Sequence, residues 1–260
     1  GADRAAAAAL RGERWLIGSG GGSQGRGDDH ATLRSLAAAW AFADVCFARA
    51  SIAPGSVRAA LSAWLRDWAP ALRGGQSRAL TSIAAFAEDA EKDAGVPAEA
   101  HASYWPAVCA CCALGWHAQA LELLGLHSVW EQPHTPEVLA RLEALEPVST
   151  LLTAVPKLED DEAPADDEST AAARAHQAAH YREAWRQQVA GVFASSHGWG
   201  ALDEREREGL RAVLRVLAGE RDALLTAGGG GWLDAMVASA VHAWPALAAP
   251  TDLPDHAAEV

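Results

Sequence analysis

The chain has 260 residues and a mass of 27.2 kDa, which is enough for a sizeable hydrophobic core. Its formal net charge of -13 argues against a protein that binds along nucleic-acid phosphates or on an anionic membrane surface. Alanine makes up almost a quarter of the residues. Because alanine is the best helix former and a poor strand former, the composition favours an all-α protein.

In chain order, the first predicted feature is a flexible glycine- and serine-rich linker over residues 18–30. After it, apolar residues recur at steps of three and four, the spacing of one helix face. These stripes are Leu33, Leu36, Trp40, Ala43 and Phe47; Val57, Leu61, Trp64, Leu65, Trp68 and Leu72; Val138, Leu142, Leu145 and Leu152; Tyr181, Trp185, Val189 and Val192; Leu210, Val213, Leu214 and Leu217; and Leu233, Met236, Val237, Ala240, Val241 and Trp244.

The breaks between these stripes are few. Residues 148–155 are the only mildly strand-like run and fit a helix equally well. Residues 159–168 predict a solvated acidic loop. Asp203 is an expected helix N-cap, followed by Glu204, Glu206 and Glu208, whose charges complement the helix dipole. We therefore predict one all-α segment over residues 1–260, with about eight to ten helices stacked in pairs as an irregular, coat-like solenoid.

The cysteines and the uncharged stretches indicate a reducing compartment and no membrane span. Cys46 stands alone and the other three cysteines crowd one turn, which does not suit a disulfide scaffold. No secretory signal is recognisable near the N-terminus. The longest uncharged stretch, residues 100–121, is interrupted by histidine, proline and glycine, so we expect no insertion into a membrane.

Two histidine- or cysteine-containing groups are candidates for metal binding, and both are better explained structurally. Cys109, Cys111 and Cys112, with His101 and His117 nearby, lack the C-x₂-C spacing that turns two thiolates onto one zinc ion, so we interpret them as core residues. His176 and His180 have the correct i, i+4 spacing. The next residue after His176 is Gln177 and not the glutamate of a metalloprotease, so a solvated helix face is favoured.

Other motifs are weaker still. Residues 21–25 match the G-x-S-x-G pattern of a nucleophile elbow, but no strand precedes them. The acidic run 159–168 lacks the ordered spacing of a calcium loop, although it could contact a basic partner. The 11 tryptophans could line a groove, yet at helical spacing they are more often core residues. We therefore predict no catalytic, cofactor-binding or metal-binding residues and no cofactor.

A resemblance to a known family lies in the order of motifs after residue 104. Its first half comprises Tyr104-Trp105-Pro106, Gly115-Trp116, the leucine-rich run 118–124, Gly125-Leu126-His127-Ser128, and a helix ending in the run 148–156. Its second half comprises Trp185, Phe193, Trp199, the run 209–219, Asp222-Ala223-Leu224, Gly231-Trp232-Leu233-Asp234-Ala235-Met236 and the run 241–245. This succession, over about residues 55–247, resembles the frount family, the "eighty-five" nucleoporin of the Y-shaped complex in the nuclear pore outer ring.

The resemblance implies a function that the residues alone do not. It implies an α-helical solenoid with a doubled-back trunk that acts as a structural scaffold in the nucleus, at the nuclear pore complex of the nuclear envelope, and not as an enzyme. It also implies other Y-complex nucleoporins as partners, with an indirect role in mRNA export and protein import. One implied partner is a WD-repeat β-propeller subunit; the strands with which the family completes that propeller lie N-terminal to such a region, so its contact is expected outside this chain. Because family members are longer and the chain opens with Gly1, we expect a central segment. The alternatives are a vesicle-coat or tethering subunit and, less favoured, an all-helical metal-dependent enzyme.

Overall fold

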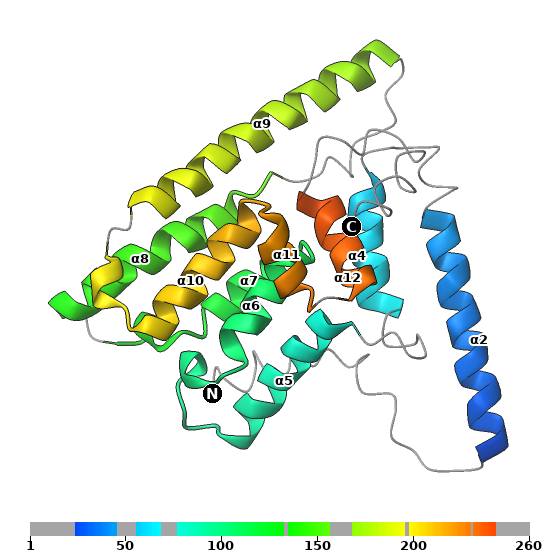
Figure 1. The fold of residues 1–260 in the computed structure, drawn as a ribbon, viewed down its shortest axis with the longest axis horizontal. Coiled ribbons are helices and arrows are strands. Elements are labelled where there is room, and N and C mark those ends of the chain that lie inside the picture. Colours follow the sequence, from blue (N-terminus) through cyan, green and yellow to red (C-terminus); the bar gives the residue numbers. More distant parts are fainter. Residues whose placement is uncertain are drawn as a thin grey trace.

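A computed structural model of the chain describes residues 24–45, 56–68, 77–132, 135–156, 168–195, 198–229 and 231–242 (Figure 1). Its longer helices are α2 (Gln24–Ala43), α4 (Ser56–Trp68), α5 (Arg78–Lys92), α6 (Tyr104–Ala113), α7 (His117–Leu124), α8 (Pro136–Thr153), α9 (Glu168–Ser195), α10 (Glu204–Leu217), α11 (Arg221–Ala227) and α12 (Trp232–His242). Three short 3₁₀ turns lie between them, namely η3 (Ala98–Ala100), η4 (Ser128–Trp130) and η5 (Trp199–Ala201).

The all-α prediction is confirmed, since every regular element in these ranges is helical. The ambiguous run 148–155 forms the end of α8, which stops at Thr153. Within the described ranges, no helix combines the length and the apolar character needed to cross a bilayer. Of the acidic run 159–168, Glu168 is the first residue of α9 and the remainder lies outside the described residues.

The linker prediction over residues 18–30 is wrong for its second half, because α2 begins at Gln24. Glycine occurs at only two positions of residues 24–30, and each glycine costs a helix about 1 kcal/mol relative to alanine. Extending the alanine-rich helix that follows adds a backbone hydrogen bond for each residue ordered, which offsets that cost. Residues 18–23 lie outside the described part of the chain.

Helix α6 is the centre of the molecule and contacts α5, α7 and α10 most extensively (Figure 1). All of its residues except Pro106 are buried. Helix α10 approaches it closely at Gly209, where a Cβ atom would lie 2.2 Å from Cδ2 of Trp105. Glycine at this position therefore lets the indole of Trp105 pack flat against the backbone of α10.

The corner between α6 and α7, at Gly115 and Trp116, is tightly packed. Gly115 has φ = 77°, the left-handed conformation that glycine adopts without strain, and a Cβ atom there would lie 3.1 Å from Cγ1 of Val241. Trp116 is 5% exposed and its indole N–H donates to Ser62 Oγ at 3.0 Å. The corner therefore joins α4, α6 and α12.

Neighbouring helices stack in sequence order, with α6 on α7, α7 on α8, α10 on α11 and α11 on α12. The chain then doubles back, because α12 packs against α4. Asp234 of α12 accepts a hydrogen bond at 2.9 Å from the backbone N–H of Arg78, at the start of α5. A side chain from the C-terminal part of the described chain therefore caps a helix of the N-terminal part.

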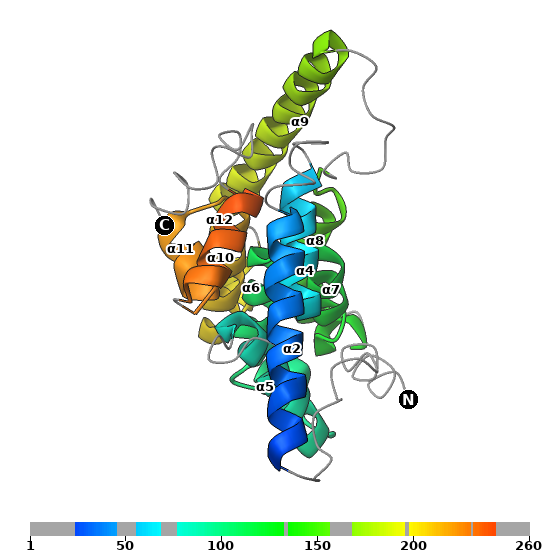
Figure 2. The same cartoon turned by 90° about the vertical axis from the view of Figure 1, so that its right-hand side faces the viewer.

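Two helices lie on the outside of this body, as the two views together show (Figures 1 and 2). The C-terminal half of α9 packs on α8 through Trp185, whose indole N–H donates to the carbonyl of Leu151 at 3.0 Å. Helix α2 packs on α4, where the indole of Trp64 donates to the carbonyl of Ala38 at 2.9 Å.

The predicted apolar stripes of α8, α10 and α12 face the core, but the stripe of α2 does not. Leu33, Leu36 and Trp40 point to solvent, whereas Ala38 is fully buried. The small side chain of Ala38 lets Trp64 approach the backbone of α2, and this packing turns the large residues outwards. The large residues of this stripe therefore lie outside the core.

Candidate functional site

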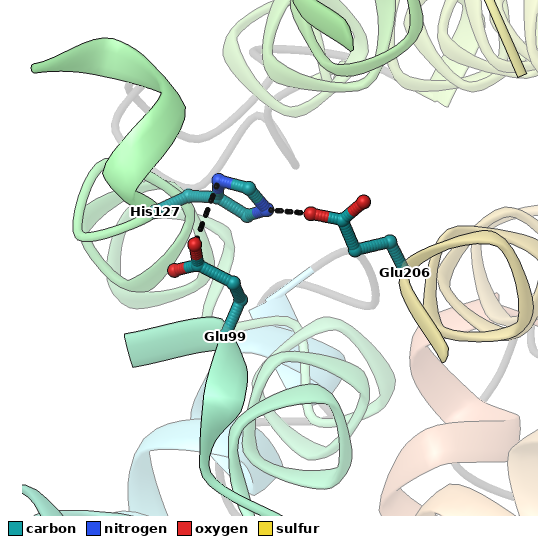
Figure 3. A group of neighbouring side chains, drawn as sticks. All are labelled: Glu99, His127 and Glu206. Atoms are coloured by element: carbon teal, nitrogen blue, oxygen red, sulfur yellow. Dashed lines mark ion pairs between the residues drawn. The ribbon is translucent and has the colours of Figure 1, made fainter. Parts of the chain in front are cut away.

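Within the described residues, Glu99, His127 and Glu206 form a group whose side chains lie close enough together to be considered as metal ligands (Figure 3). Glu99 lies in η3, His127 directly precedes η4, and Glu206 lies in the first turn of α10. Their ligand-type atoms lie within 4.8 Å of one another. Arg141 of α8 completes the group, which we call the acidic junction, by an ion pair with Glu206 Oε1.

The helix start at α10 places Glu206. The side chain of Asp203 accepts the backbone N–H of Glu206 at 2.8 Å, and Glu206 Oε2 accepts the backbone N–H of Asp203 at 3.0 Å. This is a capping box, in which two unsatisfied N–H groups of the helix end are paired reciprocally. The capping box leaves Glu206 Oε1 directed at Arg141 and His127.

His127 is completely buried at the centre of the acidic junction. Its Nδ1 accepts the backbone N–H of Val129 at 3.2 Å, so the proton of a neutral imidazole lies on Nε2. Nε2 lies 3.2 Å from Glu206 Oε1, an ion-pair distance without regular hydrogen-bond geometry. The rings of Tyr104 and Trp105 flank the imidazole at 6.3 and 6.2 Å between centroids.

Both carboxylates of the junction are held in the charged form. Burial by itself raises the pKa of Glu206, but contacts from His127, the N–H of Asp203 and Arg141 outweigh burial and lower the pKa to about 2. Burial likewise raises the pKa of Glu99, and hydrogen bonds, chiefly from Ser128, lower it below the usual value. The N–H of Ser128 donates to Glu99 Oε2 at 3.1 Å and its hydroxyl donates to Oε1.

The oxygen and nitrogen atoms that could bind a metal ion at this junction already have hydrogen-bond partners within the protein. Both oxygens of Glu206 and both of Glu99 accept hydrogen bonds, and Nδ1 of His127 accepts another. The guanidinium of Arg141 would also repel a cation placed beside Glu206. Because His127 has no exposed surface, no substrate reaches its imidazole. The arrangement suits a structural junction that joins η3, η4, α8 and α10.

A second cluster, of two histidines and two arginines, lies where side chains of α9 reach the C-terminal end of α12. His242 is buried, and its Nε2 donates to the carbonyl of Cys112 at 2.9 Å. The ring of His117 lies edge-on to it, 6.3 Å away between centroids. Arg182 donates to the carbonyl of Val241 at 2.8 Å, and Arg186 donates to that of His242. We call these four side chains the basic junction.

At the basic junction the pKa shifts favour the neutral form of the histidines, whereas at the acidic junction they favour the charged form of the carboxylates. Burial, with a smaller effect of the Arg182 charge, lowers the pKa of His117 to about 4. Burial, the neighbouring His117 and the two arginines lower the pKa of His242 to about 3, although its hydrogen bond to Cys112 acts in the other direction. The two arginines satisfy carbonyl groups at the C-terminal end of α12, where cations also complement the helix dipole.

The structure does not assemble the metal-ligand sets considered from the sequence. Cys109, Cys111 and Cys112 are buried in α6, and burial raises the pKa of the Cys109 and Cys111 thiols to about 12. His101 packs against Phe86, away from His117 at the basic junction. The interpretation of these cysteines as core residues is confirmed. Cys46 lies outside the described residues.

The other candidates also have simple positions. His176 and His180 are exposed on α9, as the solvated-face interpretation predicts. Of the G-x-S-x-G pattern, Ser23 lies outside the described residues and Gly25 belongs to α2. Most described tryptophans are at least partly buried, but Trp40 and Trp232 are 79% and 72% exposed. The core interpretation of the tryptophans therefore fails at these two positions.

Sequence reasoning missed both junctions. The Asp203-x-x-Glu206 spacing is a recognisable capping-box signal and could have shown that Glu206 is more than a dipole-complementing charge. Nothing local indicates that Glu206 meets His127 and Arg141, which come from other elements. The same holds for Arg182 and His242.

The fold and these junctions define a class of protein, an all-α protein whose buried charges join helices to one another. The comparison with family models agrees with this class. The model of the Nup85 nucleoporins matches residues 22–260, and the chain belongs to this family. Searches of the curated proteins and of the solved structures found no match. The chain is thus a nuclear pore protein whose partners are other nucleoporins of the nuclear pore complex.

Proposed function

We propose that this chain is a scaffold segment of the Y-shaped outer-ring complex of the nuclear pore, and that residues 1–260 form one continuous helical segment of it. In this role it supports pore assembly, and through the pore it supports mRNA export and protein import. It acts by holding partners, among them a WD-repeat β-propeller subunit, and not by catalysis. The family match over residues 22–260 supports the proposal.

The observation that carries this proposal is the use of the buried titratable groups. In the acidic junction, every carboxylate oxygen accepts a hydrogen bond from the protein. In the basic junction, Arg182, Arg186 and His242 all donate to backbone carbonyl groups. These carboxylates, arginines and histidine bond to the protein itself and join helices that are distant in sequence. They are therefore not available to a substrate, and the joined helices suit a rigid scaffold.

Localisation and co-purification of the chain test the proposal. We expect the fluorescently tagged chain to mark the nuclear rim and to co-purify with other Y-complex subunits. A matched variant, Glu206→Ala, should weaken both signals through loss of fold, whereas Glu204→Ala on the exposed side of the same turn should not. A diffuse or Golgi pattern of the wild-type chain would contradict the proposal and favour the vesicle-coat alternative.

A further inference from the structure

Thr135 lies at the start of α8 in a sequence that proline-directed protein kinases recognise. Residues 133–136 read Pro-His-Thr-Pro, and nowhere else in the chain does a proline directly follow a serine or a threonine. Kinases of this class require the following proline, and a second proline two positions before the hydroxyl residue improves the match. The sequence therefore offers a single acceptor for a proline-directed kinase.

The backbone at Thr135 has the extended form in which kinase clefts bind their substrates. Its φ is -77° and its ψ is 161°. The ring of Pro136 disfavours a helical conformation of the residue before it, so the motif itself favours this extended form. Thr135, Pro136 and Glu137 are all exposed. A kinase can therefore reach the hydroxyl and the following proline from the surface.

The hydroxyl of Thr135 has different partners from those of four other exposed hydroxyl residues. It accepts the backbone N–H of Val138 at 3.4 Å, as a helix N-cap. The pKa of Glu137 is lowered by its own backbone N–H and by the Thr135 hydroxyl, so a charged carboxylate lies beside this hydroxyl. The other four each donate to a backbone carbonyl group three or four residues earlier in the chain, namely Thr81, Thr153, Ser195 and Thr226.

We propose that Thr135 is phosphorylated by a proline-directed serine/threonine kinase and that the phosphate then caps α8. In the transfer, the hydroxyl oxygen of Thr135 attacks the γ-phosphorus of Mg-ATP. The hydroxyl proton passes to a base of the kinase, and the bond between the γ-phosphorus and the leaving ADP breaks. The product carries about two negative charges and three acceptor oxygens. This inference goes beyond the proposed function and does not depend on it.

The start of α8 suits the product. The first N–H groups of a helix have no partner within the helix, and the helix dipole favours negative charge there. Pro136 has no N–H, so the first such groups belong to Glu137 and Val138. Because a phosphate carries about twice the charge of a carboxylate, it replaces the side chain of Glu137 at these N–H groups. The first turn of α8 becomes more stable as a result.

Phosphorylation of the purified chain by a mitogen-activated protein kinase with Mg-ATP tests the inference. We expect a single phosphate on Thr135, located by tandem mass spectrometry. Pro136→Ala retains the hydroxyl and the N-cap and should reduce the rate of labelling at least tenfold. Thr135→Asn retains a good N-cap without the hydroxyl and should abolish labelling. Thr150→Ala, at an exposed threonine of the same helix, should leave labelling unchanged.

Amide hydrogen exchange tests the capping role. Exchange at the N–H of Val138 should slow several-fold in the phosphorylated chain, and kinase treatment of Thr135→Asn should not change it. Unchanged exchange at Val138 in the phosphorylated wild-type chain would overturn the capping role.

Labelling in cells completes the test. The tagged chain, isolated from cells with phosphatase inhibitors present, should carry the phosphate on Thr135. Its absence there, a phosphate on another residue, or equal labelling of Pro136→Ala and the wild type by the purified kinase would overturn the assignment of Thr135. None of these measurements requires the chain to reach the nuclear rim, so this inference and the proposed function fail independently.

Discussion

The two buried junctions use the same residue type in opposite ways. His127 lies between two carboxylates at the acidic junction, and Glu206 there also pairs with Arg141. His117 and His242 lie beside two arginines at the basic junction, and within the described residues no carboxylate is paired with those arginines. Both junctions hold helices from distant parts of the chain together.

Because their charged groups differ, the two junctions respond differently to a decrease in pH. At the acidic junction the charged partners hold the pKa of Glu206 at about 2, so its charge is present at any ordinary pH. At the basic junction burial keeps both imidazoles neutral, and the arginines donate to backbone carbonyl groups instead of to acids. The first junction depends on opposite charges, and the second depends on the absence of additional positive charge.

The largest effect should come from removing the central carboxylate of the acidic junction. Glu206→Ala leaves Arg141 and His127 without their partner and breaks the capping box, so we expect a loss of about 3–5 kcal/mol in the free energy of unfolding. Urea denaturation at pH 7 measures it. Glu204→Ala, on the exposed side of the same turn, should cost less than about 0.5 kcal/mol.

A second variant at the same position separates the effect of the negative charge of Glu206 from that of the capping box. Glu206→Gln retains a side-chain acceptor for the N–H of Asp203 but not the negative charge beside Arg141. A loss as small as that of Glu204→Ala would show that the acidic junction does not depend on charge, and the contrast between the two junctions would be wrong.

Acid should weaken the basic junction first. The folded chain keeps His117 and His242 neutral down to about pH 4 and 3, while the unfolded chain binds protons below about pH 6.5. The stability is therefore complete above pH 6.5 and falls as the pH decreases towards 4, by about 2.5 kcal/mol for each histidine at pH 4.5. Loss of the Glu206 charge adds to this only below pH 4.5, because its pKa is lowered from 4.5 to about 2.

Unfolding by urea at pH 7.0, 5.5 and 4.5 checks this window. His242→Gln keeps a donor for the carbonyl of Cys112 and should reduce the pH dependence by about half. His176→Gln, at an exposed position of α9, should leave the pH dependence unchanged. A stability that is flat between pH 6.5 and 4.5 would mean that the two histidines are not buried as neutral groups.

A smaller effect should follow from removing one arginine of the basic junction. Arg182→Gln weakens the cap on the carbonyl of Val241 and should cost about 1 kcal/mol. It also removes a positive charge from beside His117, so the pKa of that histidine should rise from about 4 towards its usual value. NMR titration measures the pKa, and Glu183→Gln on the same helix is the control. An unchanged His117 pKa would contradict the role assigned to Arg182.

The smallest effect should come from Trp40 of α2, which belongs to neither junction. Because Trp40 is 79% exposed, Trp40→Gln should change the free energy of unfolding of the purified chain by less than about 0.5 kcal/mol. Thermal and urea denaturation measure it. A larger loss would show that Trp40 packs within the folded chain.

Local features determined much of the fold. The spacing of apolar residues placed α8, α10 and α12 and the faces that they bury, and Asp203 marked the start of α10. The order of the motifs around Gly115 and Gly209 pointed to the family before the fold was seen. These features are readable because helix periodicity, capping and sharp turns depend on residues only a few positions apart.

Only the tertiary structure decided which faces and charges meet. Periodicity shows that Leu33, Leu36 and Trp40 share a face, but the packing of Trp64 against Ala38 turned that face outwards. Glu206 and Arg141 are 65 residues apart, and Asp234 and Arg78 are 156 apart. No local pattern encodes such pairs, because they form only when the close packing of complete helices brings distant side chains to the same place.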